Sequence, residues 1–181
     1  GQGYTQTTPL QLCLMTAQIA NGGYKIKPKI IVNDDPLSLE DAKKTMELQS
    51  LQKPNTRLFR DPKNIKIVQE AMFSSTNEQF GTSYRSRIDD PKYQFAGKTG
   101  TSQVKRISKR ERELDLKLEQ IPYKDRDHAL YVAYGPYKNP RYALSIIVEH
   151  GGSGSKAAAP MAKELFKLII DRDELLSLIH I

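Results

Sequence analysis

The sequence predicts an α+β fold in which an antiparallel sheet of three main strands is flanked by helices. Two helix starts, at Thr8-Pro9 and Asp61-Pro62, come first along the chain. Three strand-like segments follow at residues 93–104, 129–134 and 142–148, and a periodic apolar stretch comes after them. Because helices and strands are grouped instead of alternating regularly, the pattern favours α+β over a parallel α/β sheet.

The first helix begins at Thr8, where the sequence carries the features of a capping box. Thr8 can cap, Pro9 suits the first helical position and Gln11 can reach back. Asn21-Gly22-Gly23 ends the helix. Apolar residues lie on both sides of it, so we expect burial on most faces. They are Leu10, Leu12, Leu14, Met15, Ala17 and Ile19.

The second helix begins at Asp61-Pro62 and should end before Gly81. Between the two helices, residues 24–28 indicate a short extended piece at an edge, and residues 33–60 a polar surface excursion. The buried stripe of the second helix is expected to contain Ile65, Val68 and Met72, with Ala71 beside them.

The strands at 129–134 and 142–148 flank a turn-rich loop and predict a hairpin. The charged stretch between residues 105 and 127 favours helix and suits a solvated insertion. The last helix follows the glycine loop at 151–154, and Pro160 lies near its first turn. Its apolar stripe is expected to be Met161, Leu165, Leu168 and Ile169.

Composition is that of a globular domain with 181 residues, 38% hydrophobic and 27% charged. The net charge of +7 comes mostly from dispersed Lys and Arg, and the dense run at 105–112 lacks interleaved aromatic residues, so no nucleic-acid partner is expected. No apolar run approaches the roughly 18 residues of a membrane span. Cys13 is the only cysteine, which excludes an internal disulfide and suits a buried, inert thiol.

Histidine and cysteine patterns do not predict a metal site, and no cofactor is expected. His128, His150 and His180 have no paired spacing and no cysteine nearby. His128 suits the start of a strand, and His150 a loop at the end of the sheet.

The informative segment is Lys98-Thr99-Gly100-Thr101, with Gly97 before it. A cation flanked by hydroxyls can bind a carboxylate, and glycines in a strand often mark the close approach of a ligand or another backbone. An open strand edge would let an extended peptide lie along it. A phosphate-binding loop is excluded because the chain lacks the glycine that this motif requires before Gly97, and because no helix follows.

Lys-Thr-Gly is also the third signature of serine β-lactamases and penicillin-binding proteins. The chain resembles the class B penicillin-binding proteins, most closely their penicillin-binding protein 2 branch, the cell-elongation transpeptidases. The resemblance implies a serine β-lactamase/transpeptidase-like fold and spans nearly the whole chain. Its anchors are Gly1-Gln2-Gly3-Tyr4, Thr8-Pro9-Leu10-Gln11, the segment from Ala96 to Val104, Asp127-His128-Ala129, Ala133-Tyr134-Gly135-Pro136 and the segment from Val148 to Gly154.

The resemblance implies roles in acyl transfer from stem peptides that end in D-Ala-D-Ala, with β-lactams as mimics. Lys98 and Thr101 would be catalytic, Lys98 by shaping the field of the site and Thr101 through its backbone N–H in the oxyanion hole. The substrate-binding strand would comprise Lys98, Thr99, Gly100, Thr101 and Gln103. The parent protein would work at the periplasmic face of the bacterial inner membrane, with the cell-elongation machinery as partner.

The family also needs Ser-x-x-Lys and Ser-x-Asn, which lie upstream of the segment resembled here. We therefore expect residues 1–181 to be the carboxy-terminal portion of the domain, with no nucleophile in this chain. Both patterns do have matches in this chain. The first is matched by Ser50-Leu51-Gln52-Lys53 and also by segments that begin at Ser102 and Ser153, and the second by Ser75-Thr76-Asn77. Lys53 precedes a proline, which disfavours helical geometry there, and Ser75 falls at the tail of a helix and not on a loop facing the strand.

Alone, the chain is expected to be inactive, to expose apolar surface and to self-associate. Two other functions stay open on the residues. One is a D-Ala-D-Ala carboxypeptidase or β-lactamase-like enzyme, and the other is a non-catalytic substrate-binding module.

Overall fold

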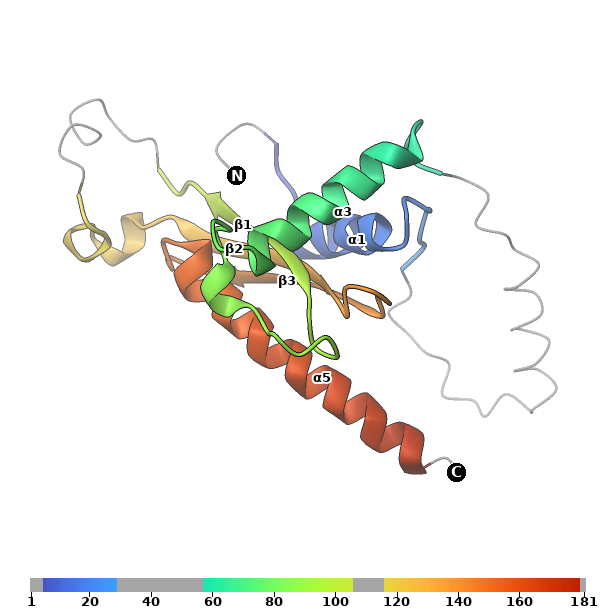
Figure 1. Ribbon diagram of the computed structural model, residues 1–181. Helices are drawn as coiled ribbons and strands as arrows, with labels where there is room; N and C mark the ends of the chain where they lie inside the picture. The colour runs from blue at the N-terminus through green and yellow to red at the C-terminus, as the bar shows by residue number, and fades with distance from the viewer. Residues whose placement is uncertain (1–4, 29–56, 106–115, 180–181) are drawn as a thin grey trace, which may run out of the picture.

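The computed structural model describes residues 5–28, 57–105 and 116–179. Helices and strands follow the predicted grouping (Figure 1). The α-helices and strands are α1 (Pro9–Ala20), α3 (Pro62–Asn77), β1 (Ala96–Ser102), β2 (His128–Gly135), β3 (Tyr142–Val148) and α5 (Ala159–Ile179). A π-helical turn, η4 (Gly154–Ala158), leads into α5.

The strands form one antiparallel sheet in the order β1-β2-β3, which confirms the predicted fold class. The register places Lys98 opposite Val132 and Tyr131 opposite Ile146. β1 begins at Ala96, three residues later than the predicted start at Tyr93, because residues 91–93 form a turn. The hairpin of β2 and β3 and the start of β2 at His128 agree with the sequence prediction.

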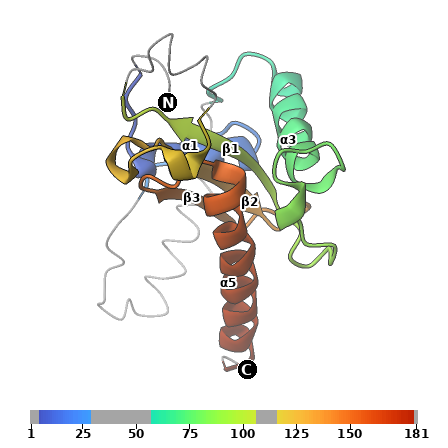
Figure 2. The same ribbon diagram turned by 90° about the vertical axis from the view of Figure 1, so that its left-hand side faces the viewer.

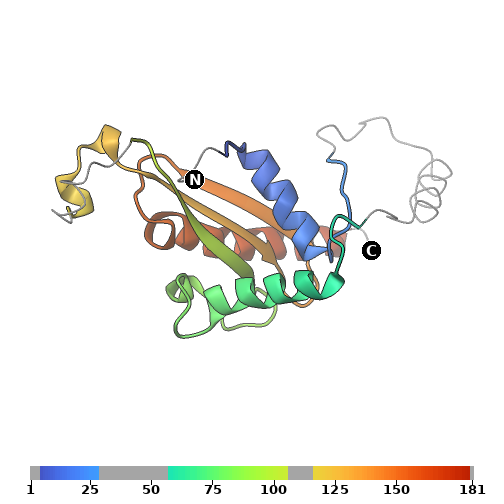
Figure 3. The same cartoon turned by 90° about the horizontal axis from the view of Figure 1, so that it is seen from above.

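α5 covers one face of the sheet, and α1 lies over the other (Figures 2 and 3). The core under α5 is fully buried and centres on Phe95, Tyr131 and Phe166, with the Phe95 and Phe166 rings stacked at 4.9 Å. α5 packs there through Ala158, Ala159, Ala162, Phe166 and Ile170, the first of them contributed by η4.

The predicted stripe of the last helix was therefore wrong. Met161, Leu165 and Leu168 are 51%, 40% and 67% exposed, and Ile169 is only partly buried. The helix is apolar on two sides, and the side with small alanines lies against the sheet because small side chains let the backbones approach closely. The expectation of exposed apolar surface is met, and self-association stays a prediction.

α1 begins as predicted, with Gln11 N–H donating to Thr8 Oγ1 and Thr8 N–H donating to Gln11 Oε1. The prediction that it is buried on most faces was wrong, because only Thr16 is fully buried and Leu10 and Met15 are 53% and 43% exposed. α1 packs mainly on β3 and β2, with a smaller contact to α3.

α3 begins at the Asp61 cap and ends before Gly81, as predicted, and it runs alongside β1 (Figure 3). Its buried residues are Ile65, Met72 and Thr76. Val68 is 40% exposed and Ala71 is exposed, so their place in the predicted stripe was wrong. Between the buried residues Ile65 and Met72 lies the partly buried Gln69, whose amide donates to Ile19 O and Ala20 O at the end of α1.

The remaining segments are short and irregular. Tyr24 forms a single β-bridge with Arg57, so the extended piece at residues 24–28 is not a strand, and most of the excursion at 33–60 lies outside the described residues. The helix expected in the stretch 105–127 is wrong where that stretch is described, since residues 116–127 form only two short 3₁₀ turns. In the described parts of the chain no helix is long and apolar enough to cross a membrane.

Candidate functional site

β1 carries the predicted site residues and lies at the edge of the sheet, since β2 is its only strand partner in the described chain. The Gly97 N–H points away from β2, because it donates to Thr76 Oγ1 at 3.0 Å. Backbone groups alternate between the two edges of an antiparallel strand. The N–H and C=O groups of Thr99 and Thr101 therefore face the open edge as well.

Polar side chains follow this edge from α3 to the cation. The Lys98 ammonium donates to Thr99 O at 3.0 Å and to Thr99 Oγ1 at 3.2 Å. Thr99 Oγ1 lies 3.3 Å from Thr82 Oγ1, which lies 3.2 Å from Ser75 Oγ. A positive charge and several hydroxyls thus meet at one exposed place, which suits binding of a carboxylate.

An open hollow of about 550 Å³ adjoins β1 on the side of α1. All the predicted site residues line it, namely Lys98, Thr99, Gly100, Thr101 and Gln103. Its apolar wall includes Leu12 and Met15 of α1 and Leu130 of β2. A polar strand edge beside an apolar wall is an arrangement that accepts an extended peptide.

Beneath the start of β1 lies a cluster of three buried hydroxyls that the sequence analysis did not identify as functional. Thr76, Ser83 and Tyr131 are at most 1% exposed. Tyr131 Oη lies 2.9 Å from both Thr76 Oγ1 and Ser83 Oγ. Burial raises the pKa of Tyr131, and the bonds to Ser83 and Thr76 oppose that rise. A tyrosine facing inward from a strand, which needs a partner for its hydroxyl, was the available signal.

The glycines of the site are explained by close packing within the chain. A Cβ at Gly97 would overlap the ring and hydroxyl of Tyr131. Gly154 at the start of η4 lies directly against β1 and β2, where a Cβ would meet Gly100 O at 2.9 Å and also the Leu130 carbonyl. The close approach expected at these glycines is therefore made by the protein itself.

Three of the four serines that match catalytic patterns, Ser75, Ser102 and Ser153, lie in the described part of the chain. Ser75 lies in the last turn of α3, as predicted, although Thr82 connects it to Thr99, so it is nearer the strand than expected. Ser153 Oγ is bonded to Ser155 Oγ at 3.0 Å. Ser50 and Lys53 lie outside the described residues.

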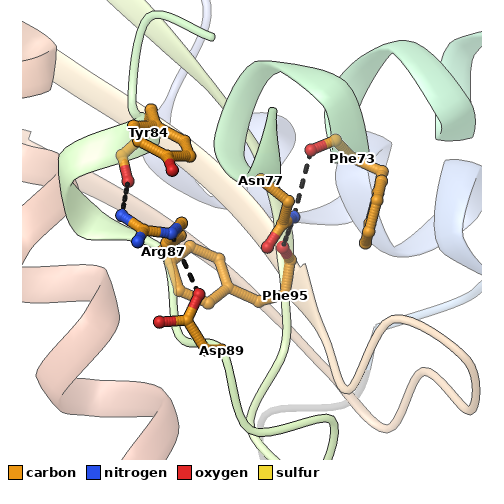
Figure 4. Close-up of polar contacts among 6 residues, drawn as sticks. All are labelled: Phe73, Asn77, Tyr84, Arg87, Asp89 and Phe95. Carbon is orange, nitrogen blue, oxygen red and sulfur yellow. Dashed lines mark hydrogen bonds and ion pairs between the residues drawn. The ribbon is translucent and has the colours of Figure 1, made fainter. Parts of the chain in front are cut away.

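Asn77, the third residue of the Ser75 match, has a structural part. Its amide donates to Phe73 O at 3.0 Å and to Phe95 O at 2.9 Å (Figure 4). These bonds fasten the end of α3 to the residue before β1. In the same figure, Arg87 is bonded to Asp89 and Tyr84 O, which braces the connection between the helix and the strand.

His128 and His150 lie together at the end of the sheet. The His150 N–H donates to His128 Nδ1 at 2.9 Å, and the rings are 4.8 Å apart. His150 is in a loop with φ of 55°. Among the described residues no group of three or more His, Cys, Asp or Glu could hold a metal ion. Cys13 is half-buried, its thiol donates to Ala143 O, and burial raises its pKa.

Comparison with known proteins gives the family. The model of the penicillin binding protein transpeptidase domain matches residues 1–167. The peptidoglycan D,D-transpeptidase MrdA of Salmonella typhimurium is 33% identical over 173 residues, which are 94% of this chain and 26% of that protein. MrdA of Haemophilus influenzae is 29% identical over 172 residues, 95% of this chain and 25% of that protein. The chain therefore spans about a quarter of the length of these curated relatives.

Solved structures agree with this assignment. Pseudomonas aeruginosa PBP2, in complex with WCK 5153, matches 93% of this chain and 31% of its own, with a TM-score of 0.63 and 32% identity. PBP2 of Helicobacter pylori, in a complex with MreC, matches 93% of this chain and 26% of its own, with a TM-score of 0.62 and 30% identity. This chain therefore belongs to the penicillin-binding protein transpeptidase domains, and it is similar to those of the PBP2 type.

Proposed function

We propose that residues 1–181 are the carboxy-terminal part of a serine D,D-transpeptidase that cross-links peptidoglycan stem peptides through an acyl-enzyme. In this proposal the chain supplies the strand that binds the D-Ala-D-Ala end of the donor, and β-lactams bind as mimics of that end. A Ser-x-x-Lys and a Ser-x-Asn segment outside this chain supply the nucleophile and its base. The observation that carries the proposal is the open edge of β1 beside the Lys98 ammonium.

The chemistry follows from what faces that edge. An extended donor peptide adds to β1 as a further strand and pairs with the backbone groups of Thr99 and Thr101. Its carboxylate takes charge from Lys98 and hydrogen bonds from the two threonine hydroxyls. The Thr101 N–H then stabilises the oxyanion that forms during acylation. Gly100 has no side chain that would obstruct the peptide between these groups, and Gln103 extends the site along the hollow.

The place of work and the partners of the parent protein are part of the same proposal. The PBP2 structure from Helicobacter pylori contains MreC, which supports a partner in the cell-elongation machinery for the parent. We place that parent at the periplasmic face of the bacterial inner membrane, where stem peptides are cross-linked.

Covalent labelling with a fluorescent penicillin tests the proposal. The protein encoded by the complete reading frame should take one label per molecule, on a serine outside residues 1–181. The 181-residue chain alone should take none. A stoichiometric adduct on Ser50 or on another serine of this chain would refute the assignment of the nucleophile.

The part played by β1 needs a separate variant. Lys98→Ala in the complete protein should lower the acylation rate about a hundred-fold or more, the usual loss when one donor is removed from a preorganised site. Lys156→Ala is the matched control, because Lys156 is an exposed cation on η4 that does not line the hollow beside β1. Equal rates for the two variants would show that β1 is not the substrate strand. Cross-linked dimer as product, instead of trimmed monomer, separates a transpeptidase from a carboxypeptidase.

A further inference from the structure

The three buried hydroxyls beneath β1 form one hydrogen-bonded cluster, in which Thr76 Oγ1 also lies 3.3 Å from Ser83 Oγ. The Gly97 N–H donates to Thr76 Oγ1 at 3.0 Å, and Ser83 Oγ donates to Ser75 O at 3.0 Å. Tyr131 Oη lies 2.9 Å from both intervening hydroxyls. If Thr76 donates to Tyr131 and Tyr131 donates to Ser83, every hydroxyl proton of the cluster has an acceptor. The cluster therefore connects the backbone of β1 to the end of α3.

This cluster of hydroxyls marks where the open edge of β1 ends. At Gly97 the edge position is occupied by Thr76, whose hydroxyl meets both the N–H and, at 3.4 Å, the C=O of that residue. The next edge groups along the strand, those of Thr99 and Thr101, have no such cover from α3. An added peptide strand can therefore pair from Thr99 onward and not at Gly97.

The cluster is also joined to the exposed part of the site. Thr82 precedes Ser83 in the chain, and its hydroxyl lies 3.3 Å from Thr99 Oγ1. A shift of Ser83 would therefore move the neighbour that contacts Thr99. The buried bonds thus hold the backbone of the strand at Gly97, and the exposed contact holds the side chain of Thr99.

Stability alone does not require three hydroxyls at this place. Apolar side chains of the same shape can replace hydrogen-bonded partners in a core with little loss. Directional bonds do what such packing does not, since each sets the position of one atom relative to another. We propose that Thr76, Ser83 and Tyr131 are positioning residues, which end the substrate edge at Gly97 and hold Thr99 and Thr101 for acyl transfer. This inference rests on the function proposed above.

The test compares Thr76→Val with Thr76→Ser in the complete protein. Valine keeps the shape of threonine without the hydroxyl, whereas serine keeps the hydroxyl. Acylation by a fluorescent penicillin is followed to saturation, to separate the first-order acylation rate constant from the apparent dissociation constant. We expect Thr76→Val to lower the rate constant about ten-fold or more, because small misplacements of reacting groups are costly, and Thr76→Ser to stay within about two-fold. Tyr131→Phe should behave like Thr76→Val.

A purely structural role would give a different result. Thr76→Val would then label a smaller fraction of molecules, with the labelled ones reacting at the unaltered rate constant, and this would overturn the inference. An unaltered rate constant at full labelling, or equal losses in the valine and serine variants, would overturn it as well. If the unaltered complete protein is not acylated, the proposed function fails and this inference fails with it.

Discussion

Gly154→Ala is a substitution for which the structure predicts a large effect from a single methyl group. Gly154 is buried at the start of η4, where it lies against two strands of the sheet. An added Cβ would meet Gly100 O at 2.9 Å and would come still closer to the Leu130 carbonyl. Both obstacles are backbone atoms within the β1–β2 ladder, so no side-chain rotation can relieve the overlap.

The expected loss of stability follows from this geometry. Overpacking a core typically costs about 1–3 kcal/mol, and the upper end applies here because the neighbouring atoms are fixed. In a chain of this length each kcal/mol lowers the melting temperature by about 2–4 °C. We therefore expect Gly154→Ala to melt roughly 6–12 °C lower, measured by circular dichroism or calorimetry.

Gly100→Ala is the matched control. Its Cβ would have one neighbour, Leu130 Cβ, at 3.3 Å, which is a tight contact with a side chain on the partner strand. We expect its melting temperature to fall by less than about 4 °C, corresponding to about 1 kcal/mol. Equal melting temperatures for Gly154→Ala and the unaltered protein would refute the reasoning, because they would mean that η4 does not lie against the sheet as described.

Three further predictions concern α5, α1 and acid stability. Phe166→Ala should lower the free energy of unfolding by about 3–5 kcal/mol, whereas Leu168→Ala should change it little because Leu168 is 67% exposed; chemical denaturation compares the two. Thr8→Ala should cost about 1 kcal/mol by removing the helix cap, with Thr8→Ser close to unaltered in the same assay. The Tyr93 hydroxyl, with Lys92, holds the pKa of Asp171 below its usual range. This stabilisation is present above the pKa of Asp171 in the unfolded state and is lost as the pH falls through its pKa in the folded state. The melting temperature of Asp171→Asn should therefore fall less than that of the unaltered protein when the pH is lowered below about 4.

Local signals were enough to predict the elements that position the site. The capping box at Thr8, the Asp61-Pro62 start and the hairpin of β2 and β3 depend on residues close together in sequence, and the structure contains all three. The strand with Lys98 was found for the same reason, since its pattern is contiguous. Elements of this kind need no knowledge of what lies across the fold.

The buried sides of the helices depend on their neighbours, and there the prediction failed. α5 has an apolar stripe of Met161, Leu165 and Leu168 on one side and Ala162 and Phe166 on another, and periodicity alone favoured the first. The helix instead packs on the sheet with the side where alanines allow close approach and the Phe166 ring stacks on Phe95. On α3, Gln69 occupies part of the buried side because its amide donates to the carbonyls of the last two residues of α1.

The same limit applies to the support beneath the site. Thr76 and Tyr131 are 55 residues apart in sequence, and Ser83 lies in the loop between α3 and β1. Sequence matching placed Thr76 inside a Ser-x-Asn match, in which only Ser75 and Asn77 belong to the pattern. In the fold, however, Thr76 contacts the backbone of β1 at Gly97. A motif thus identifies the groups that would touch the ligand, whereas the groups that hold them in place become visible only when the tertiary contacts are known.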